Sequence, residues 1–188
     1  MSVVAGSLGA MDWVGHGVED RRGDWLGECV RDAELRQVYA DVAHLADWSP
    51  WAPFADGVAQ APRLPGVYLF RESVSQVVRY VGMAGERAGS GRPRGLHGRL
   101  TVYLSGQEPV SGFAEAALDR ALCDEDWIEH QVRRPRAEGG RPAKRWAADA
   151  IAWLAPDVTW ATCHERADAR YLESEVALLL RPFGLWNR

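Results

Sequence analysis

The chain has 188 residues, a length that fits one domain with extensions or two very small domains. Its apolar fraction of 47% is ordinary for a globular protein and allows a real core, and no apolar run is long enough to span a membrane. The net charge of −4 argues against a strongly basic nucleic-acid binder, but residues 61–100 and residues 131–146 each carry a local charge of +5. Such basic stretches can still attract a polyanion, because salt screens the repulsion from acidic groups beyond about 8–10 Å.

Three cysteines lie far apart in the chain, at positions 29, 123 and 163, and no Cys-x-x-Cys pair occurs. This spacing predicts neither a disulfide framework nor a zinc ribbon. The first eleven residues lack the basic start of a secretory signal. We therefore expect a cytoplasmic protein that does not associate with membranes.

The first half of the chain predicts a helix followed by a β-hairpin. Apolar residues at helical spacing indicate an amphipathic helix within residues 20–47, and a turn rich in proline and tryptophan follows it. Residues 65–70 and 76–82 are rich in β-branched and aromatic side chains, which favours two strands, and residues 71–75 are a polar hairpin connection.

The second half predicts helices and one further strand. Asp124 is placed to cap one of the helices, and the basic stretch Arg133 to Pro142 is expected to be a loop. Pro182 and Gly184 should end the closing helix. The expected helices are 96–104, 112–122, 124–132, 143–154 and 168–180, and the expected strand is 157–163.

The glycine-rich segment after the second strand has two interpretations. A dinucleotide-binding loop is one, but the spacing Gly89-x-Gly91-x-x-x-Gly95 is one residue too long and no βαβ pattern follows. A flexible connection beside a basic surface is the other, and we prefer it.

Two helices carry side chains that suit a phosphodiester. Arg99 and Tyr103 are four residues apart and share one face of their helix. Glu173 lies at the border of the apolar stripe of the closing helix. A carboxylate there is costly unless a cation or hydrogen bonds meet it, and a hard divalent metal would satisfy it.

These residues belong to a set of five elements that follow one another in the chain. They are Gly66-Val67-Tyr68, Tyr80-Val81-Gly82, Leu96-x-x-Arg99-Leu100-x-x-Tyr103, Leu172-Glu173 with Pro182, and Asn187. In this order the set resembles the GIY-YIG endonucleases, which include homing endonucleases, the incision domain of bacterial nucleotide-excision repair and some restriction enzymes. The resemblance implies an α+β fold with a small three-stranded antiparallel sheet flanked by helices in residues 61–188. Residues 106–155 would be a helical insertion, and residues 1–60 an N-terminal helical extension.

The resemblance implies catalytic roles for three phenols and one guanidinium. Tyr68 would be a candidate general base near the attacking water, and Tyr80 would position water or phosphate. Arg99 would contact the scissile phosphate and offset its developing charge, and Tyr103 matches a position that holds His or Tyr in the family. Because tyrosine has a reference pKa near 10, phenolate at neutral pH requires nearby positive charge.

The resemblance also implies a metal ligand, a structural brace and a nucleic-acid surface. Glu173 would hold one divalent cation, Mg²⁺ or Mn²⁺, and Asn187 would brace the site. Counting back twelve residues from Asn187 selects Glu175 instead, but Leu172 precedes Glu173 and its helix face is better. Contacts to the nucleic-acid backbone would come from Arg79, Arg87, Arg92, Arg94 and His97.

The expected function is therefore a divalent-metal-dependent endonuclease with DNA as its partner. Two alternatives stay open: a binding module on the same fold without turnover, and a toxin-like or defence nuclease that cleaves RNA. A homodimer is compatible with the sequence, because cutting two strands often needs two active sites.

Overall fold

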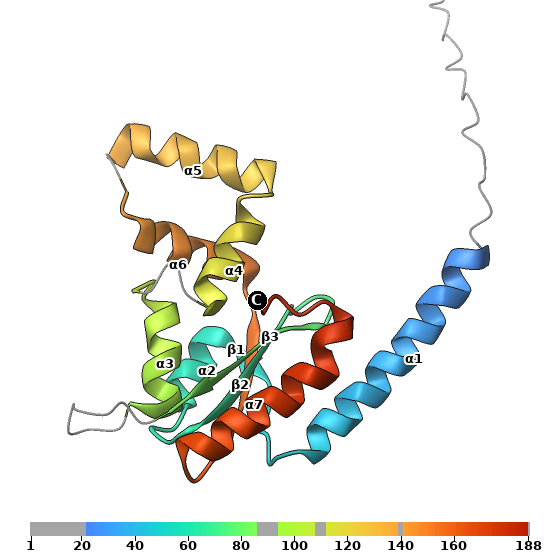
Figure 1. Ribbon diagram of the computed structural model, residues 1–188. Helices are drawn as coiled ribbons and strands as arrows, with labels where there is room; N and C mark the ends of the chain where they lie inside the picture. Colours follow the sequence, from blue (N-terminus) through green and yellow to red (C-terminus); the bar gives the residue numbers. More distant parts are fainter. Residues whose placement is uncertain (1–21, 86–93, 108–111, 139–140, 188) are drawn as a thin grey trace, which may run out of the picture. The chain divides into compact units, whose positions relative to one another are not determined.

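The computed structural model describes residues 22–85, 94–107, 112–138 and 141–187 (Figure 1). The chain forms two compact units, residues 1–36 and residues 37–188. Helix α1 (Arg22–His44) begins in the first unit, and its last residues belong to the second. Within the described part of the chain, no helix combines the length and the apolar character needed to cross a lipid bilayer.

The second unit is built on a four-stranded antiparallel sheet with the order β1-β4-β2-β3. Strand β2 (Gly66–Arg71) lies between β3 (Val78–Ala84) and β4 (Asp157–Thr162). These are the three strands predicted from the sequence. The fourth, β1 (Ala52–Pro53), was not predicted, because its two residues stand in a segment whose prolines are typical of turns.

Side chains of β2 alternate between two buried layers, as the period of a strand requires. Tyr68 and Phe70 point into a large cluster on one face, and Val67 and Leu69 point into a smaller cluster on the other. Because helices cover both faces, the five residues from Gly66 to Phe70 are all buried.

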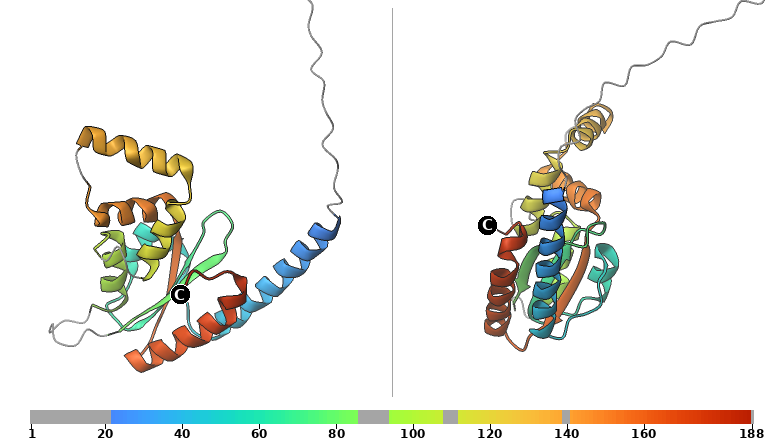
Figure 2. Two further views of the ribbon diagram at one scale, coloured as in Figure 1. Left: turned by 45° about the horizontal axis from the view of Figure 1, so that its top comes forward. Right: turned by 90° about the vertical axis from the view of Figure 1, so that its right-hand side faces the viewer.

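Five helices contribute to the larger cluster: α2 (Phe54–Gln60), α3 (Gly95–Leu104), α4 (Gly112–Ala121), α5 (Glu125–Glu138) and α6 (Ala143–Leu154). The smaller cluster packs against α7 (Arg166–Leu180) and against Val42 near the end of α1. Figure 2 shows α7 and α2 on opposite sides of the sheet. The described part of the chain is therefore α+β, with a sheet between two helical layers.

Most of the predicted helices are present with small shifts at their ends. Asp124 accepts a hydrogen bond of 2.7 Å from the backbone N–H of Trp127, and so caps α5 (Glu125–Glu138) as predicted. The prediction of a loop from Arg133 was wrong, because α5 continues through Pro135 to Glu138. Helix α2 and the short 3₁₀-helix Arg181–Phe183 were not predicted.

The compact unit that contains the sheet begins at Gln37, whereas the sequence predicts the nuclease-like domain from residue 61. The difference has a packing cause. Phe54 and Val58 of α2 are buried in the larger cluster, and Val42 is buried in the smaller one. Trp48 also forms an isolated β-bridge with Ala161 of β4.

Candidate active site

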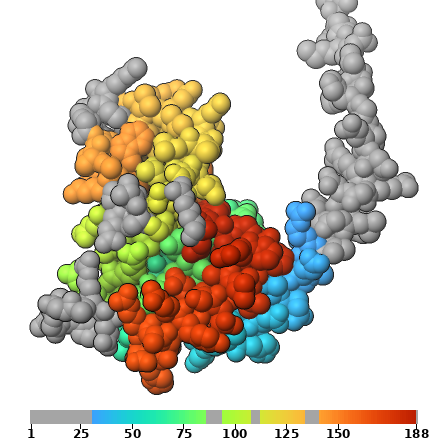
Figure 3. All heavy atoms as spheres, viewed as in Figure 1, coloured from blue at the N-terminus to red at the C-terminus, as the bar shows by residue number. Residues whose placement is uncertain are grey.

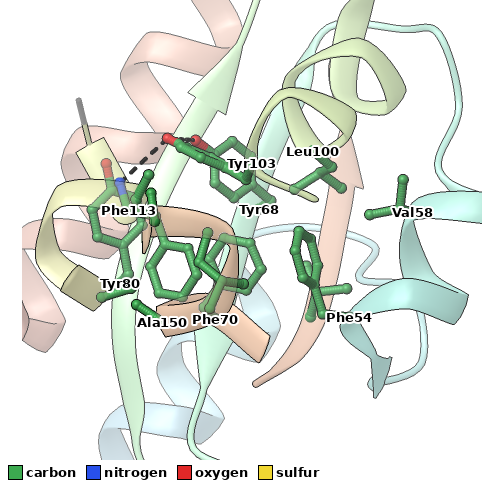
Figure 4. Packing of buried hydrophobic residues seen from close by; sticks show 14 of the residues in the cluster. Phe54, Val58, Tyr68, Phe70, Tyr80, Leu100, Tyr103, Phe113 and Ala150 are labelled. Carbon is green, nitrogen blue, oxygen red and sulfur yellow. Dashed lines mark hydrogen bonds between the residues drawn. The ribbon is translucent and has the colours of Figure 1, made fainter. Parts of the chain in front are cut away.

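Three tyrosines and one phenylalanine from four elements meet above one face of the sheet (Figure 4). The hydroxyl of Tyr68 on β2 lies 3.1 Å from that of Tyr103 on α3, within hydrogen-bonding distance. The backbone N–H of Phe113, in the first turn of α4, donates to the Tyr103 hydroxyl at 3.4 Å. Tyr80 on β3 completes the group, and none of the four side chains is more than 8% exposed. This phenol cluster, Tyr68, Tyr80 and Tyr103, unites three residues that lie far apart in the sequence.

A glycine at the start of α4 leaves space for the hydroxyl groups of the phenol cluster. Gly112 has a left-handed backbone, with φ of 55°, and a Cβ there would lie 2.6 Å from the Tyr103 hydroxyl and 2.8 Å from that of Tyr80. Because only glycine adopts this conformation at little cost and leaves that space, the first turn of α4 can approach both phenols. The predicted insertion therefore contributes directly to the walls of the site.

The Arg99 guanidinium lies over the Tyr103 ring, 4.8 Å from its centroid. The two residues are one helical turn apart on α3, as the sequence predicts. The positive charge of Arg99 lowers the pKa values of Tyr68 and Tyr80 and of the Glu173 carboxyl group. The guanidinium thus acts electrostatically on both the phenols and the acidic side chain.

Burial dominates the titration of the phenols. Removal from water raises the pKa of Tyr68 and of Tyr80 well above the ordinary value, and the neighbouring tyrosines raise both further. Arg99 opposes this shift without reversing it. Both phenols are therefore protonated at neutral pH, and their first role in this structure is to donate or share hydrogen bonds.

Glu173 is half-buried on α7, on the side of that helix next to β3. Burial raises the pKa of its carboxyl group, while a hydrogen bond from the Met83 backbone N–H and the charges of Arg170 and Arg99 lower it. Glu173 also acts on Tyr80, whose pKa it raises. The carboxylate therefore shares its electrostatic surroundings with the phenol and the guanidinium.

The outer edge of β3 is closed by side chains and backbone from the end of the chain. The Asn187 amide pairs with the backbone of Val81, accepting from its N–H at 3.0 Å and donating to its carbonyl at 2.7 Å. The Trp186 backbone N–H donates to the Arg79 carbonyl at 2.6 Å. With the bond from Met83 to Glu173, three alternate residues of this strand edge each have a hydrogen-bond partner. Asn187 thus makes a bracing contact of the kind that the resemblance implies.

Glu173 is suited to a magnesium site in which the protein supplies one carboxylate, and less suited to a site in which every ligand is a protein side chain. Its carboxylate is held in place by the Met83 N–H, and oxygen is the ligand that Mg²⁺ prefers. In the described ranges, no three His, Cys, Asp or Glu side chains come together as a metal-binding group. Mg²⁺ commonly uses one or two carboxylates and completes its shell with water and phosphate oxygens. The residues present therefore fit that mode of binding.

Glu175, the alternative ligand, occupies another side of the same helix. Two residues are separated by about 200° around an α-helix, so Glu175 faces away from the side that carries Glu173. The electrostatic partners found for Tyr80 include Glu173. This geometry favours Glu173.

The predicted nucleic-acid contacts that lie in the described ranges have different surroundings. Arg79 pairs with Glu72, with 3.1 Å between Nε and a carboxylate oxygen, and the Nδ1 atom of His97 lies 3.0 Å from the Val58 carbonyl oxygen. Arg94 is exposed at the start of α3, and Arg87 and Arg92 lie outside the described residues. His97 and Arg99 are also about 200° apart around α3, so they face different surroundings.

A cavity of about 330 Å³ opens beside the phenol cluster. Sequence reasoning missed its walls, since α4 and the last residues of the chain meet only in the folded protein. Its lining is Tyr80, Gly112, Glu115, Ala116, Asp119, Arg120, Leu185, Trp186 and Asn187.

Comparison with known proteins does not extend this description. No protein-family model, no curated protein and no solved structure matches the chain.

Proposed function

We propose that this protein is a divalent-metal-dependent endonuclease of the GIY-YIG type that hydrolyses phosphodiester bonds in DNA. One observation carries the proposal: the Arg99 guanidinium of α3 lies 4.8 Å from the centroid of the Tyr103 ring, within the phenol cluster. The carboxylate of Glu173 on α7 accepts from the Met83 backbone N–H at the edge of β3, the strand that carries Tyr80. A guanidinium and a carboxylate that both act on one phenol suit a phosphate together with its counter-ion.

Each side chain has a role that follows from its surroundings. Arg99 would offset the negative charge that develops on the phosphate during attack by water. Tyr80 would donate its hydrogen bond to water or to a phosphate oxygen, because it keeps its proton at neutral pH. Glu173 would hold Mg²⁺ or Mn²⁺, which when bound supplies Lewis-acid stabilisation of the leaving oxygen.

Tyr68 has a more restricted role than the resemblance alone implies. It is 1% exposed, and its hydroxyl lies within hydrogen-bonding distance of that of Tyr103. A base must reach the proton that it removes, so a base role for Tyr68 would require both access and a large drop in its pKa. We therefore propose that Tyr68 and Tyr103 position Tyr80 and Arg99 as neutral phenols.

Plasmid nicking tests the proposal. We expect the wild-type protein to nick supercoiled DNA in Mg²⁺ and to lose this activity in EDTA. Arg99→Ala should lower the rate about 100-fold or more, as removal of a charge-stabilising donor does in other active sites. Arg36→Ala is a matched control, because Arg36 is exposed on α1.

The alternatives give different results in the same assay. A binding module without turnover would shift DNA in a gel without cutting it, and Glu173→Ala would leave that binding unchanged. A nuclease specific for RNA would cut a structured RNA and leave the plasmid intact. Either result would contradict the proposal.

A further inference from the structure

An uncovered row of side chains runs along α7 beside Glu173. Arg166, Arg170 and Ser174 are spaced at four-residue intervals and share one face of the helix, and all three are exposed. Tyr171 stands next to them with 70% of its surface exposed. Together with Ala167 they line an open hollow of about 520 Å³, and α7 lies on the face of the molecule seen in Figure 3.

This row adjoins the candidate active site. Arg170 precedes Glu173 by three residues on α7, so the two side chains are neighbours on the surface of the helix. The aliphatic part of Arg166 lies against Gly85, just beyond the end of β3. At about 100° per residue, Arg166 and Arg170 stand within about 60° of Glu173 around the helix.

The other acidic residues of α7 lie on a different side of the helix from Glu173. Asp168 and Glu175 are about 140° and 160° from Glu173 in the other direction around the helix. The side of α7 that carries Glu173 therefore has a basic character, although α7 as a whole carries acidic residues too. The row from Arg166 to Ser174 is about 12 Å long at 1.5 Å per residue, which corresponds to the rise of three to four base pairs along the axis of duplex DNA at about 3.4 Å each.

We infer that Arg166, Arg170 and Ser174 form a track for the phosphate backbone of DNA that leads into the site at Glu173. The inference rests on the proposed function for its ligand. The guanidinium groups supply charge and planar hydrogen-bond donors. The Ser174 hydroxyl donates to the Arg170 carbonyl at 2.9 Å and could turn to a phosphate oxygen, as serine often does. The track takes the place of Arg79 and His97, which are engaged with Glu72 and Val58.

Salt-dependent binding tests the track without any cleavage. The affinity of the full-length protein for a labelled DNA duplex is measured by fluorescence anisotropy in EDTA, from about 50 to 200 mM salt. Each lost phosphate contact lowers the slope of log affinity against log salt by about 0.9. Arg166→Gln/Arg170→Gln should therefore lower the slope by about 2 and weaken binding about 30-fold near 0.15 M salt.

Two matched variants make the result specific. Arg31→Gln/Arg36→Gln changes the net charge equally on exposed residues of α1 and should keep the wild-type slope. Arg166→Lys/Arg170→Lys keeps both positive charges and should therefore keep most of the wild-type salt slope. Thermal unfolding of each variant verifies that it is folded.

The possible outcomes separate the track from the proposed function. A slope that stays at the wild-type value in Arg166→Gln/Arg170→Gln, or that falls equally in the α1 control, overturns the track even if the protein cleaves DNA. A selective loss of slope supports the track even if no cleavage is found, and absence of cleavage then contradicts the proposed function alone. A structured RNA of similar length provides a second arm, and loss of slope with RNA only would overturn DNA as the ligand.

Discussion

Tyr68 and Gly82 are direct partners in the antiparallel ladder between β2 and β3. The Tyr68 ring lies over the Cα atom of Gly82, so that a Cβ at this position would collide with the ring and with its hydroxyl. The Tyr68 ring on the neighbouring strand thus explains why position 82 holds a glycine. The two sequence motifs of the hairpin form one packing unit.

A methyl group at position 82 should displace the ring. We predict that Gly82→Ala destabilises the protein by about 1–3 kcal/mol, as overpacking of a core does. Tyr68→Leu/Gly82→Ala should recover part of this loss, because leucine leaves the space that the ring fills. Urea unfolding of both single variants and of the double variant should give a coupling energy of about 0.5–3 kcal/mol, and additive effects would show that the two residues do not share this space.

The hydroxyl of Tyr103 should contribute to stability through its hydrogen bonds with Tyr68, Tyr80 and the Phe113 backbone. Tyr103→Phe removes the partner of the buried Tyr68 hydroxyl and of the Phe113 N–H. We predict a loss of about 1–3 kcal/mol, which is the cost of leaving a buried polar group unsatisfied. Tyr171→Phe is the control: its hydroxyl stands on a side chain that is 70% exposed, and its unfolding free energy should change by less than about 0.5 kcal/mol.

The sequence predicts those helices and strands whose hydrophobic pattern lies within one continuous segment. The apolar pattern of residues 143–154 and the alternation in 157–163 are clear because a single face is buried in each case. The two-residue strand β1 and helix α2 escape such reasoning, because Pro50 and Pro53 are typical of turns. The tyrosines, Arg99 and Glu173 were chosen as candidates through the order of their motifs.

Contacts between distant segments could not be predicted in the same way. The covering of the phenols by Gly112 and Phe113 depends on how α4 docks, and the pairing of Arg79 with Glu72 depends on the hairpin register. Nor does the composition of residues 61–100 reveal that His97 faces Val58. Charge along the sequence therefore does not predict which of these side chains are engaged by other parts of the protein.

The raised pKa values of Tyr68 and Tyr80 should appear as a loss of stability in alkali. The unfolded chain releases these protons near pH 10, whereas the folded protein holds them. Since the unfolded state then binds fewer protons, the free energy of unfolding falls as pH rises above about 10, by about 1.4 kcal/mol per pH unit for each proton. Denaturant unfolding from pH 8 to 11 measures this slope, which should be smaller in Tyr68→Phe. An unchanged slope would mean that Tyr68 ionises in the folded protein.

Glu173 should reduce stability at neutral pH. Burial raises the pKa of its carboxyl group, so in the pH range between the unfolded and folded pKa values the folded state binds more protons, and the contribution to stability falls as pH rises. Glu173→Gln should therefore stabilise the metal-free protein at pH 7, by less than about 1 kcal/mol because the group is only half-buried. At pH 4 the gain should largely vanish. Melting temperatures at the two pH values test this, and a lower melting temperature of Glu173→Gln at pH 7 would be inconsistent with it.

The most direct test of the proposed function compares two acidic residues of one helix. Under single-turnover conditions with Mg²⁺, plasmid nicking is followed for the wild-type protein, Glu173→Gln and Glu175→Gln. We predict that Glu173→Gln loses about 100-fold or more of the rate, while Glu175→Gln stays within about threefold of the wild type. Equal rates for the two variants, or a wild-type protein that binds the plasmid and leaves it intact, would contradict a hydrolytic centre at Arg99, Tyr80 and Glu173.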